Sequence, residues 1–341
     1  MKKWEAYVPR VMVASMLSLL LTSCEAVRTA RLLAAYETTL ADATPEDTTE
    51  TEVTASTDAH GQPASILSAF FGLDDALPRN ANQSVCEGAF QKDGMPIVFS
   101  HEIDKGSMQA GDFEVTTASG KVRDIHCVTL APADDEGELR TALLVGHYGS
   151  VDDQPVEVEV VGNLLSLDGS INFKGQTATP IRLEAGPTIV LAETLTADEL
   201  ELGKAPTELP FGGGDGCPVG TKQAVRATWA GGVTKPGGDE ADDDERLQYR
   251  VTVQRDDGAE DLVTPFALAD LNDGDNNHLL CLDVEGTPTS VSFPAGFLTD
   301  PRDDPNPDTK RLLRGILDMG DADAEPTDGA EASRTGPAAG E

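Results

Sequence analysis

Hydrophobic and polar positions alternate along the middle of the chain. Residues 113–117, 156–160 and 247–253 each follow a period close to two, with Val, Phe, Tyr, Leu or Thr at every second position. This alternation is typical of strands that bury one face and expose the other, as in antiparallel sandwiches. Turn pairs such as Ser119-Gly120 and Asp257-Gly258 separate the runs at intervals that suit short strands. The pattern predicts an all-β fold.

A Gly/Pro-rich stretch, GKAPTELPFGGGDG at 203–216, divides this pattern into two parts. We therefore predict two consecutive antiparallel β-sandwich modules, at 66–202 and 217–308, joined by a linker. The segment FEVTTASGKVRDIHCVTLAPADDEGELRTALLV also runs parallel to YRVTVQRDDGAEDLVTPFALADLNDGDNNHLLCLDV. Both contain an aromatic-x-Val-Thr strand, a Gly turn, an apolar strand, an acidic loop and another apolar strand. A diverged duplication explains this parallel, although two unrelated sandwiches can share such a rhythm.

The N-terminus has the layout of an export signal. Basic residues precede an uncharged apolar run at 11–21, which is shorter than the about 20 residues needed to cross a bilayer. The following Leu-Thr-Ser-Cys, ending at Cys24, resembles the lipobox of bacterial lipoproteins. That resemblance implies a signal peptide at 1–23 and acylation of Cys24, which would hold the protein in the bacterial cell envelope. The alternative is an ordinary secretory signal followed by an incidental cysteine.

Two segments that flank the modules carry few apolar residues. Residues 24–65 are rich in Thr, Glu and Pro, and residues 309–341 are acidic and rich in Ala and Gly. Such compositions bury too little apolar surface to offset the entropy of ordering the chain. We expect a lipid anchor with a disordered tether at 24–65 and a disordered acidic tail at 309–341.

The charge of the chain excludes one class of partner. Asp and Glu number 60 against 25 Lys and Arg, a formal net charge of −35. This surface repels phosphate backbones, so we expect no nucleic-acid binding. An acidic excess attracts divalent cations or basic partners, but solubility is a simpler explanation. The only partner that the sequence predicts is the membrane, which the protein would reach through the lipid on Cys24. The sequence does not indicate a particular protein or glycan partner.

The cysteines agree with export. Apart from Cys24, four remain, an even number that suits an oxidising compartment. Three pairings are possible, and free buried thiols are the alternative. We favour pairing within each module, Cys86 with Cys127 and Cys217 with Cys281. Each bond would then tie the segment that leads into a module to one of that module's own strands.

Four segments stand out in the first module: GMPIVFSHEID, DFEVTTASG, ELRTALLVGHYG and EVVGNLLSLDG. Together they resemble an uncharacterised family of secreted, often lipoprotein-like, all-β proteins, and the resemblance extends from Gly94 into DGDNNHLLCLD. It implies an all-β fold and an exported location. It implies no activity and no catalytic residue.

One loop offers candidate metal ligands. The segment ALADLNDGDNNHLLCLD contains Asp270, Asn272, Asp273 and Asp275, whose hard oxygen atoms suit calcium. Their spacing, D-x-N-D-G-D, is one residue out of step with an EF-type loop. The alternative is a solvated hairpin loop in which Asn, Asp and Gly serve the turn. We favour the hairpin loop, so we expect no cofactor, with calcium as the open possibility.

Other chemistry is weakly supported. His278 and Cys281 have a zinc-like spacing, but further ligands are missing, so we expect His278 to be a loop residue. No G-x-S-x-G elbow is present, and nothing singles out a carboxylate pair. We expect a non-enzymatic structural or binding role on the cell envelope. The alternatives are a calcium-dependent adhesion or ligand-binding protein and an envelope hydrolase that uses clustered carboxylates.

Overall fold

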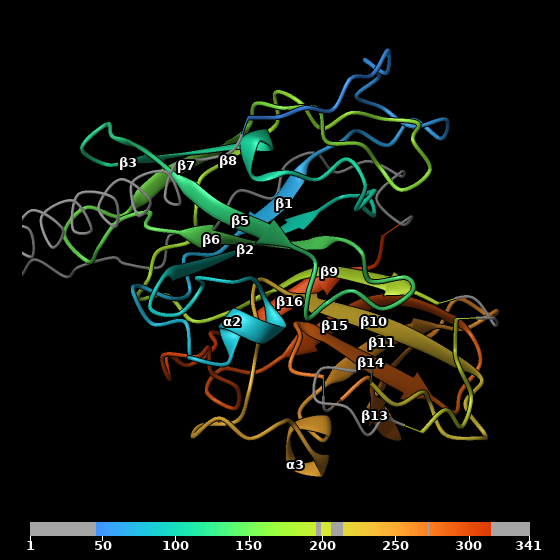
Figure 1. Ribbon diagram of the computed structural model, residues 1–341. Helices are drawn as coiled ribbons and strands as arrows, with labels where there is room; N and C mark the ends of the chain where they lie inside the picture. The colour runs from blue at the N-terminus through green and yellow to red at the C-terminus, as the bar shows by residue number, and fades with distance from the viewer. Residues whose placement is uncertain (1–45, 196–198, 206–213, 272, 315–341) are drawn as a thin grey trace, which may run out of the picture.

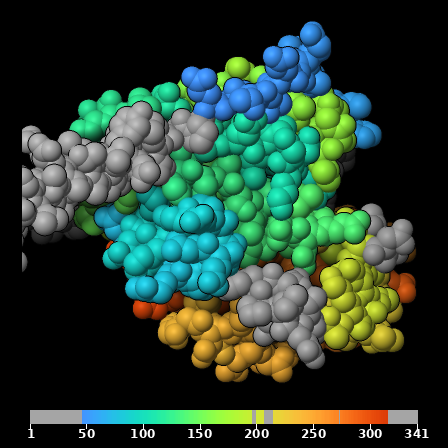
Figure 2. All heavy atoms as spheres, viewed as in Figure 1, coloured from blue at the N-terminus to red at the C-terminus, as the bar shows by residue number. Residues whose placement is uncertain are grey.

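The computed structural model describes residues 46–195, 199–205, 214–271 and 273–314. The protein is all-β: four antiparallel four-stranded sheets pack in pairs to form two sandwich modules, which lie against each other (Figures 1 and 2). The predicted signal peptide, Cys24 and Asn272 lie outside the described residues. No helix in the described part of the chain has the length and apolar character needed to cross a membrane.

The first module encloses a core between two sheets with the strand orders β1-β2-β6-β5 and β4-β3-β7-β8. Phe99, Phe113 and Phe173 lie at its centre, with the rings of Phe99 and Phe173 5.0 Å apart. The eight strands are β1 (Ile66–Ala69), β2 (Asp93–Phe99), β3 (Phe113–Thr117), β4 (Val122–Arg123), β5 (Ile125–Thr129), β6 (Thr141–Gly146), β7 (Pro155–Val160) and β8 (Thr177–Ala178).

The second module has sheets with the orders β13-β14-β10-β9 and β12-β11-β15-β16. Its core is built on Trp229, Tyr249 and Phe293, all buried. The eight strands are β9 (Ile189–Thr194), β10 (Gln223–Trp229), β11 (Arg250–Gln254), β12 (Glu260–Val263), β13 (Ala267–Ala269), β14 (Asn277–Leu282), β15 (Thr287–Phe293) and β16 (Thr309–Leu312).

The two modules have the same topology. If each strand of the first module is matched to the strand eight places later, both sheet orders coincide, with β2 corresponding to β10 and β6 to β14. The segments that run parallel in the sequence therefore occupy corresponding places. In particular, the β5–β6 loop of the first module corresponds to the β13–β14 loop of the second. This shared order supports the interpretation of a diverged duplication.

Helices are few and short in the residues that the structure describes. They are α2 (Ala81–Ser84), α3 (Asp243–Arg246) and the 3₁₀ turn η1 (Ala110–Asp112). Asp242 caps α3 by accepting a hydrogen bond from the Asp244 amide, and Glu245 completes the capping box. These short helices only connect strands, and the two cores are formed by the sheets.

The sheets divide earlier in the chain than the sequence predicts. Strand β9, assigned by sequence to the first module, pairs with β10 of the second. It is apolar on both faces because it lies where the modules meet, so its pattern carries no alternation that could assign it to either sheet. The chain passes between modules at residues 179–188. The described ends of the predicted linker instead pack on the second module, where the Asp270 amide donates to the Asp215 carbonyl.

Both flanking segments are partly ordered, which corrects their predicted limits. Residues 46–65 lie on the first module, where the side-chain amides of Asn163 and Asn172 donate to the carbonyls of Thr49 and Val53. These polar contacts anchor a segment that has little apolar surface. At the other end β16 completes a sheet beside β15, so the predicted tail begins with a strand.

Two disulfides join the four described cysteines in the within-module pairing. Cys86 is bonded to Cys127 across 41 residues, and Cys217 to Cys281 across 64. Each ties the segment before a module's second strand to a strand of the same sheet. The sulfur atoms pack in small apolar clusters outside the two main cores.

Candidate functional site: an acidic cluster between the modules

The two corresponding loops meet where the modules touch. The β5–β6 loop contributes Asp135 and Glu138, and the β13–β14 loop contributes Asp270, Asp273 and Asp275. We refer to these five residues as the acidic cluster. Acidic oxygens of Glu138, Asp270 and Asp275 all lie within 4.8 Å of one another, as do those of Asp135, Asp270 and Asp273. Asp270 belongs to both groups and therefore lies at the centre.

Most of the acidic cluster is removed from water. Glu138 and Asp273 are each 4% exposed and Asp275 is 8% exposed. The Oδ2 atom of Asp270 is buried and has no hydrogen-bond partner in the described part of the protein. Burying carboxyl groups in such numbers is costly unless protons or cations neutralise them.

One cation reaches the acidic cluster directly. Arg226, on β10, is 5% exposed, and its Nε lies 3.2 Å from Oε1 of Glu138. Its Nη1 donates to the Gly137 carbonyl at 2.6 Å and lies 3.8 Å from Glu193. Gly137 has a φ of 88°, and a Cβ there would come within 3.1 Å of the guanidinium. Among the described residues, no other cation forms an ion pair with the acidic cluster.

The electrostatics reflect this shortage of positive charge. Burial, helped by the charge of Asp275, raises the pKa of Glu138 to about 8. Burial and the neighbouring Glu138 raise the pKa of Asp270 to about 10. The pKa of Asp275 is raised well above its usual range by burial and by Asp273 and Asp270. At neutral pH the metal-free cluster therefore holds protons, and a cation that replaced them would occupy a strongly negative site.

The donor set suits a hard divalent cation. Calcium takes six to eight oxygen ligands at about 2.3–2.6 Å, mostly carboxylates and carbonyls. Zinc prefers Cys and His, and the cluster contains neither. The described residues thus provide carboxylate oxygens for calcium, from two modules rather than from one continuous loop.

The structure brings together three of the four calcium candidates and overturns the favoured view of their loop. The loop joins β13 to β14 as predicted, but Asp273 and Asp275 are buried rather than facing water. They also serve the turn: Asp275 accepts hydrogen bonds from the amide and side chain of Asn277, and Asp270 has a φ of 64°. The prediction failed because the loop packs against the other module, which covers it.

Sequence reasoning missed the partners from the first module. Asp135 and Glu138 were not candidates, although the alignment of the two halves already matched PADDEGE with the β13–β14 loop; Arg226, in the second module, was not a candidate either. That match was the available signal. A further acid, Glu240, lies near Asp273. Burial, and to a smaller extent the charge of Asp273, raise the pKa of Glu240.

Two histidines have roles that the sequence did not predict. His278 lies in β14, not in a loop, and is 2% exposed; its Nδ1 lies 2.7 Å from the Tyr249 hydroxyl, which also accepts from Trp229. Burial lowers the pKa of His278 to about 4. His101 lies between the Ser100 hydroxyl, 2.9 Å away, and Asp58, 3.4 Å away.

The Ser–His–Asp arrangement around His101 is not a catalytic triad. Ser100 is 5% exposed, and its hydroxyl accepts a hydrogen bond from the Ser65 amide and is therefore committed to the backbone of the N-terminal segment. Arg314 also lies 3.5 Å from His101 Nε2. Burial and the Arg314 charge lower the pKa of His101, which makes it a weak base. These residues hold the N-terminal segment on the first module.

Comparisons with known proteins assign the chain to no family. No family model matches it, and no curated protein matches it. Among solved structures, the N-terminal part of the bacterial S-layer protein SbsC matches with a TM-score of 0.24 and 10% identity, over 73% of this chain and 44% of that one. A longer structure of the same protein matches with a TM-score of 0.25 and 12% identity, over 74% and 41%. The chain spans less than half of either, and likenesses this distant carry no argument about function.

Proposed function

We propose that this protein is an exported lipoprotein of the bacterial envelope whose two β-sandwich modules have a structural, non-enzymatic role and are held together by a bound calcium ion. One observation carries the proposal: two corresponding loops, one from each module, bring five carboxyl groups together, and among the described residues one arginine is in ion-pair contact with them. A divalent cation would neutralise the cluster and fix the modules relative to each other.

The anchoring part of the proposal rests on the N-terminal sequence. A basic leader, an apolar run and Leu-Thr-Ser-Cys stand in the order found in lipoprotein signals. Two or more acyl chains on Cys24 would provide stable attachment, whereas a single chain is marginal. If anchoring fails while calcium binds, the protein is a secreted version of the same calcium-joined structure.

The acidic cluster supports calcium binding better than hydrolysis. A catalytic carboxyl pair must be reached by a substrate and by water. Glu138 is 4% exposed and pairs with Arg226, and Asp273 is equally buried. Buried carboxylates that converge from two modules suit an ion that bridges them.

Calorimetric titration of the purified full chain with calcium tests this proposal. We expect one strong site, abolished by Asp275→Asn in one module and by Glu138→Gln in the other. If the dissociation constant is about 10 μM, then about 1 mM calcium should raise the free energy of unfolding by about 2.7 kcal/mol. Magnesium should have a much smaller effect, because it requires tighter octahedral geometry.

The controls are two exposed acids of the second module. Asp256→Asn and Glu260→Gln remove the same charges as the two test variants but lie outside the acidic cluster. Both should bind calcium like the wild type. Equal stabilisation by calcium and magnesium, unchanged in Glu138→Gln, would mean general screening of an acidic surface and would refute the proposal.

A further inference from the structure

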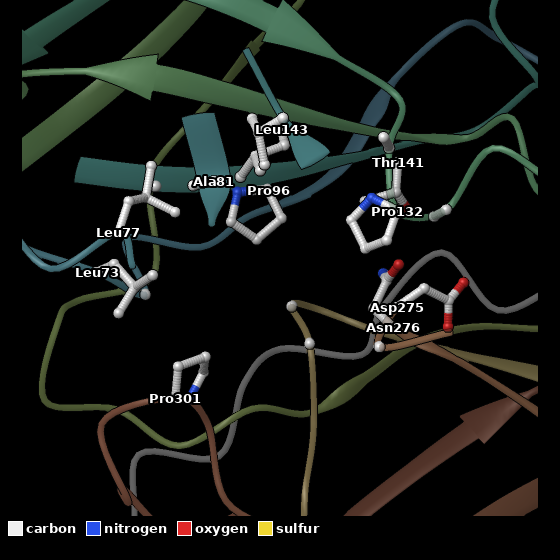
Figure 3. A pocket seen from close by; sticks show the side chains of 18 of the residues that line it. Leu73, Leu77, Ala81, Pro96, Pro132, Thr141, Leu143, Asp275, Asn276 and Pro301 are labelled. Carbon is white, nitrogen blue, oxygen red and sulfur yellow. The ribbon is translucent and has the colours of Figure 1, made fainter. Parts of the chain in front are cut away.

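Two features of the first module lie outside the acidic cluster. One is a cavity of about 240 Å³ that it shares with the second module; the lining is mostly apolar, and the side-chain amide of Asn276 at its edge already donates to the Trp229 carbonyl (Figure 3). Such a lining indicates no particular class of ligand. The other feature is a pair of carboxyl groups, Asp47 and Asp112, which joins the N-terminal segment to the body of the module.

Polar contacts hold residues 46–53 on the first module. This segment contains a single apolar side chain, that of Val53. The side chain of Gln109 accepts hydrogen bonds from the amide and the hydroxyl of Thr48, and it donates to the hydroxyl of Thr49 at 2.6 Å. Because the segment offers so little apolar surface, its position depends on hydrogen bonds and charge.

Asp112 is the carboxyl group of the module that faces this segment. It lies at the end of η1 and is fully buried. Its Oδ2 atom accepts from the Gln109 amide at 2.6 Å, whereas its Oδ1 atom receives no hydrogen bond from an amide or hydroxyl of the described residues. Oδ1 of Asp112 and Oδ2 of Asp47 converge on Gly162: a Cβ there would lie 3.0 Å from the Asp47 atom and would clash with the Asp112 atom.

The two carboxyl groups share one proton. They are hydrogen-bonded to each other, which requires one of them to be protonated, because ionised carboxylates only accept. Burial raises the pKa of Asp112 to about 7, against the hydrogen bond from the Gln109 amide and with the help of the charge of Asp47. Although burial opposes it, hydrogen bonds from the amides of Thr49 and Asn163 lower the pKa of Asp47. Asp112 therefore holds the proton and donates a hydrogen bond to ionised Asp47.

Lys174, on the β7–β8 loop, also acts on the pair. Its positive charge lowers the pKa of both carboxyl groups and so favours loss of the shared proton. The charged residues that face Asp112 are thus Asp47 from the N-terminal segment and Lys174 from the loop.

We propose that the proton shared by Asp47 and Asp112 holds residues 46–53 on the first module, and that a rise in pH towards neutrality releases them. Without the proton, two carboxylates face each other in a buried place, and their repulsion opposes binding of the segment. This switch depends neither on calcium nor on the lipid anchor. In a chain anchored through Cys24, release of residues 46–53 would let the modules reach about 25 Å further from the membrane.

The pH range of the switch follows from the two states of Asp112. When the segment is released, Asp112 is open to water and ionises near its ordinary pKa of 3.8. When the segment is bound, Asp112 keeps its proton up to about pH 7. Binding is therefore strongest below about pH 4, weakens as pH rises between these two values, and changes no further once Asp112 is ionised in both states.

Hydrogen exchange of the purified full chain, followed by mass spectrometry and corrected for the intrinsic pH dependence of exchange, measures release of the segment. The protection of amides in residues 46–53 should fall about thirtyfold between about pH 5.5 and about pH 8, and should change little between about pH 8 and about pH 9. Protection of β2, in the core of the same module, should not show this thirtyfold loss.

Three variants connect this loss to the pair. Asp112→Asn provides a permanent donor to Asp47 and keeps an oxygen for the Gln109 amide, so the segment should stay protected at both pH values. Lys174→Gln removes the charge that favours ionisation, so the loss should continue to a higher pH than in the wild type. Glu50→Gln, an exposed acid of the same segment, is the matched control and should behave like the wild type.

Three results would overturn the proposal. Constant protection of residues 46–53 in the wild type across this pH range would show that the pair does not control the segment. An equal loss in the wild type and in Asp112→Asn would assign the release to other groups. A parallel loss of the same size in β2 would mean that the module opens as a whole rather than releasing the segment.

Discussion

Replacing Arg226 by Met should make the stability of the protein depend on pH in a way that identifies its partner. Arg226 and Glu138 are 5% and 4% exposed, so the pair is screened little by solvent. The substitution removes the ion pair and the hydrogen bond to the Gly137 carbonyl. The lost hydrogen bond from a charged donor should cost about 1.5–3 kcal/mol at any pH.

The cost from Glu138 depends on whether its carboxyl is ionised. Burial raises its pKa to about 8, so below that value the group is protonated and loses little when the arginine is removed. Above it, the wild type ionises while the variant, whose pKa lies higher still, must keep the proton. The additional loss should therefore grow by about 1.4 kcal/mol for each pH unit above the wild-type pKa, until the variant itself ionises.

Urea unfolding between about pH 6 and about pH 9.5 measures this difference in EDTA, with the fluorescence of the core residue Trp229 as the signal. The double variant Arg226→Met/Glu138→Gln should keep the constant loss but not its growth with pH. Arg226→Lys should restore part of the pair. A loss in Arg226→Met that is the same at every pH, or that shrinks as pH rises, would refute the reasoning.

Three further predictions concern the acidic cluster, the core of the second module and its disulfide. In EDTA the wild type should lose stability as pH rises from about 5 to about 8, because the pKa of Glu138 is raised in the folded state and the carboxyl of Glu138 therefore ionises first in the unfolded chain. Saturating calcium should remove this loss. Thermal unfolding at several pH values measures both effects, and a flat profile in EDTA would contradict the prediction. Tyr249→Phe should lower the free energy of unfolding by about 1–3 kcal/mol, because the Trp229 indole and His278 lose their shared buried partner; a change near zero in denaturant unfolding would count against that network. Replacing Cys217 and Cys281, which form the second module's disulfide, by Ala should lower the free energy of unfolding by about 4 kcal/mol relative to the oxidised wild type, as the chain-entropy model gives for a separation of 64 residues. A loss below about 1 kcal/mol would mean that the bond constrains the unfolded chain little.

The fold was predictable where one face of a strand is buried and the other is not. Phe113, Val115 and Thr117 are all buried and their neighbours are half-buried, as the alternation predicts. The pattern failed at the ends of such runs: Val156 is exposed at the start of β7, and Leu247, in phase with the buried Tyr249, lies outside β11 and is half-exposed. Periodicity identifies the strand but not where its pairing begins.

The boundary between the modules was not predictable from local pattern. Strands β9 and β14 are buried on both faces, so neither shows which sheet it joins. The Gly/Pro-rich stretch at 203–216 was the most visible break in the sequence. Its described ends nevertheless pack on the second module, because a turn-rich segment can connect strands of one module as readily as it can separate two.

The acidic cluster was predictable only in half. Asp270, Asp273 and Asp275 are close in sequence and stood out by composition. Glu138 lies more than a hundred residues away, and its contact with them depends on how the two modules pack. The match between the two loops was visible in the repeat, but a repeat shows which loops correspond and not whether they touch.

A search for a bound cation by crystallography would test the central claim most directly. Crystals of the protein grown with terbium, a lanthanide that substitutes for calcium and scatters anomalously, should show one strong anomalous peak between the modules. We predict that it lies about 2.3–2.6 Å from carboxylate oxygens of both loops, including Glu138 and Asp275. The result would contradict a calcium-joined structure if the peaks were confined to the outer acidic surface and the carboxyl groups of Glu138 and Asp270 were hydrogen-bonded to each other with no cation between them.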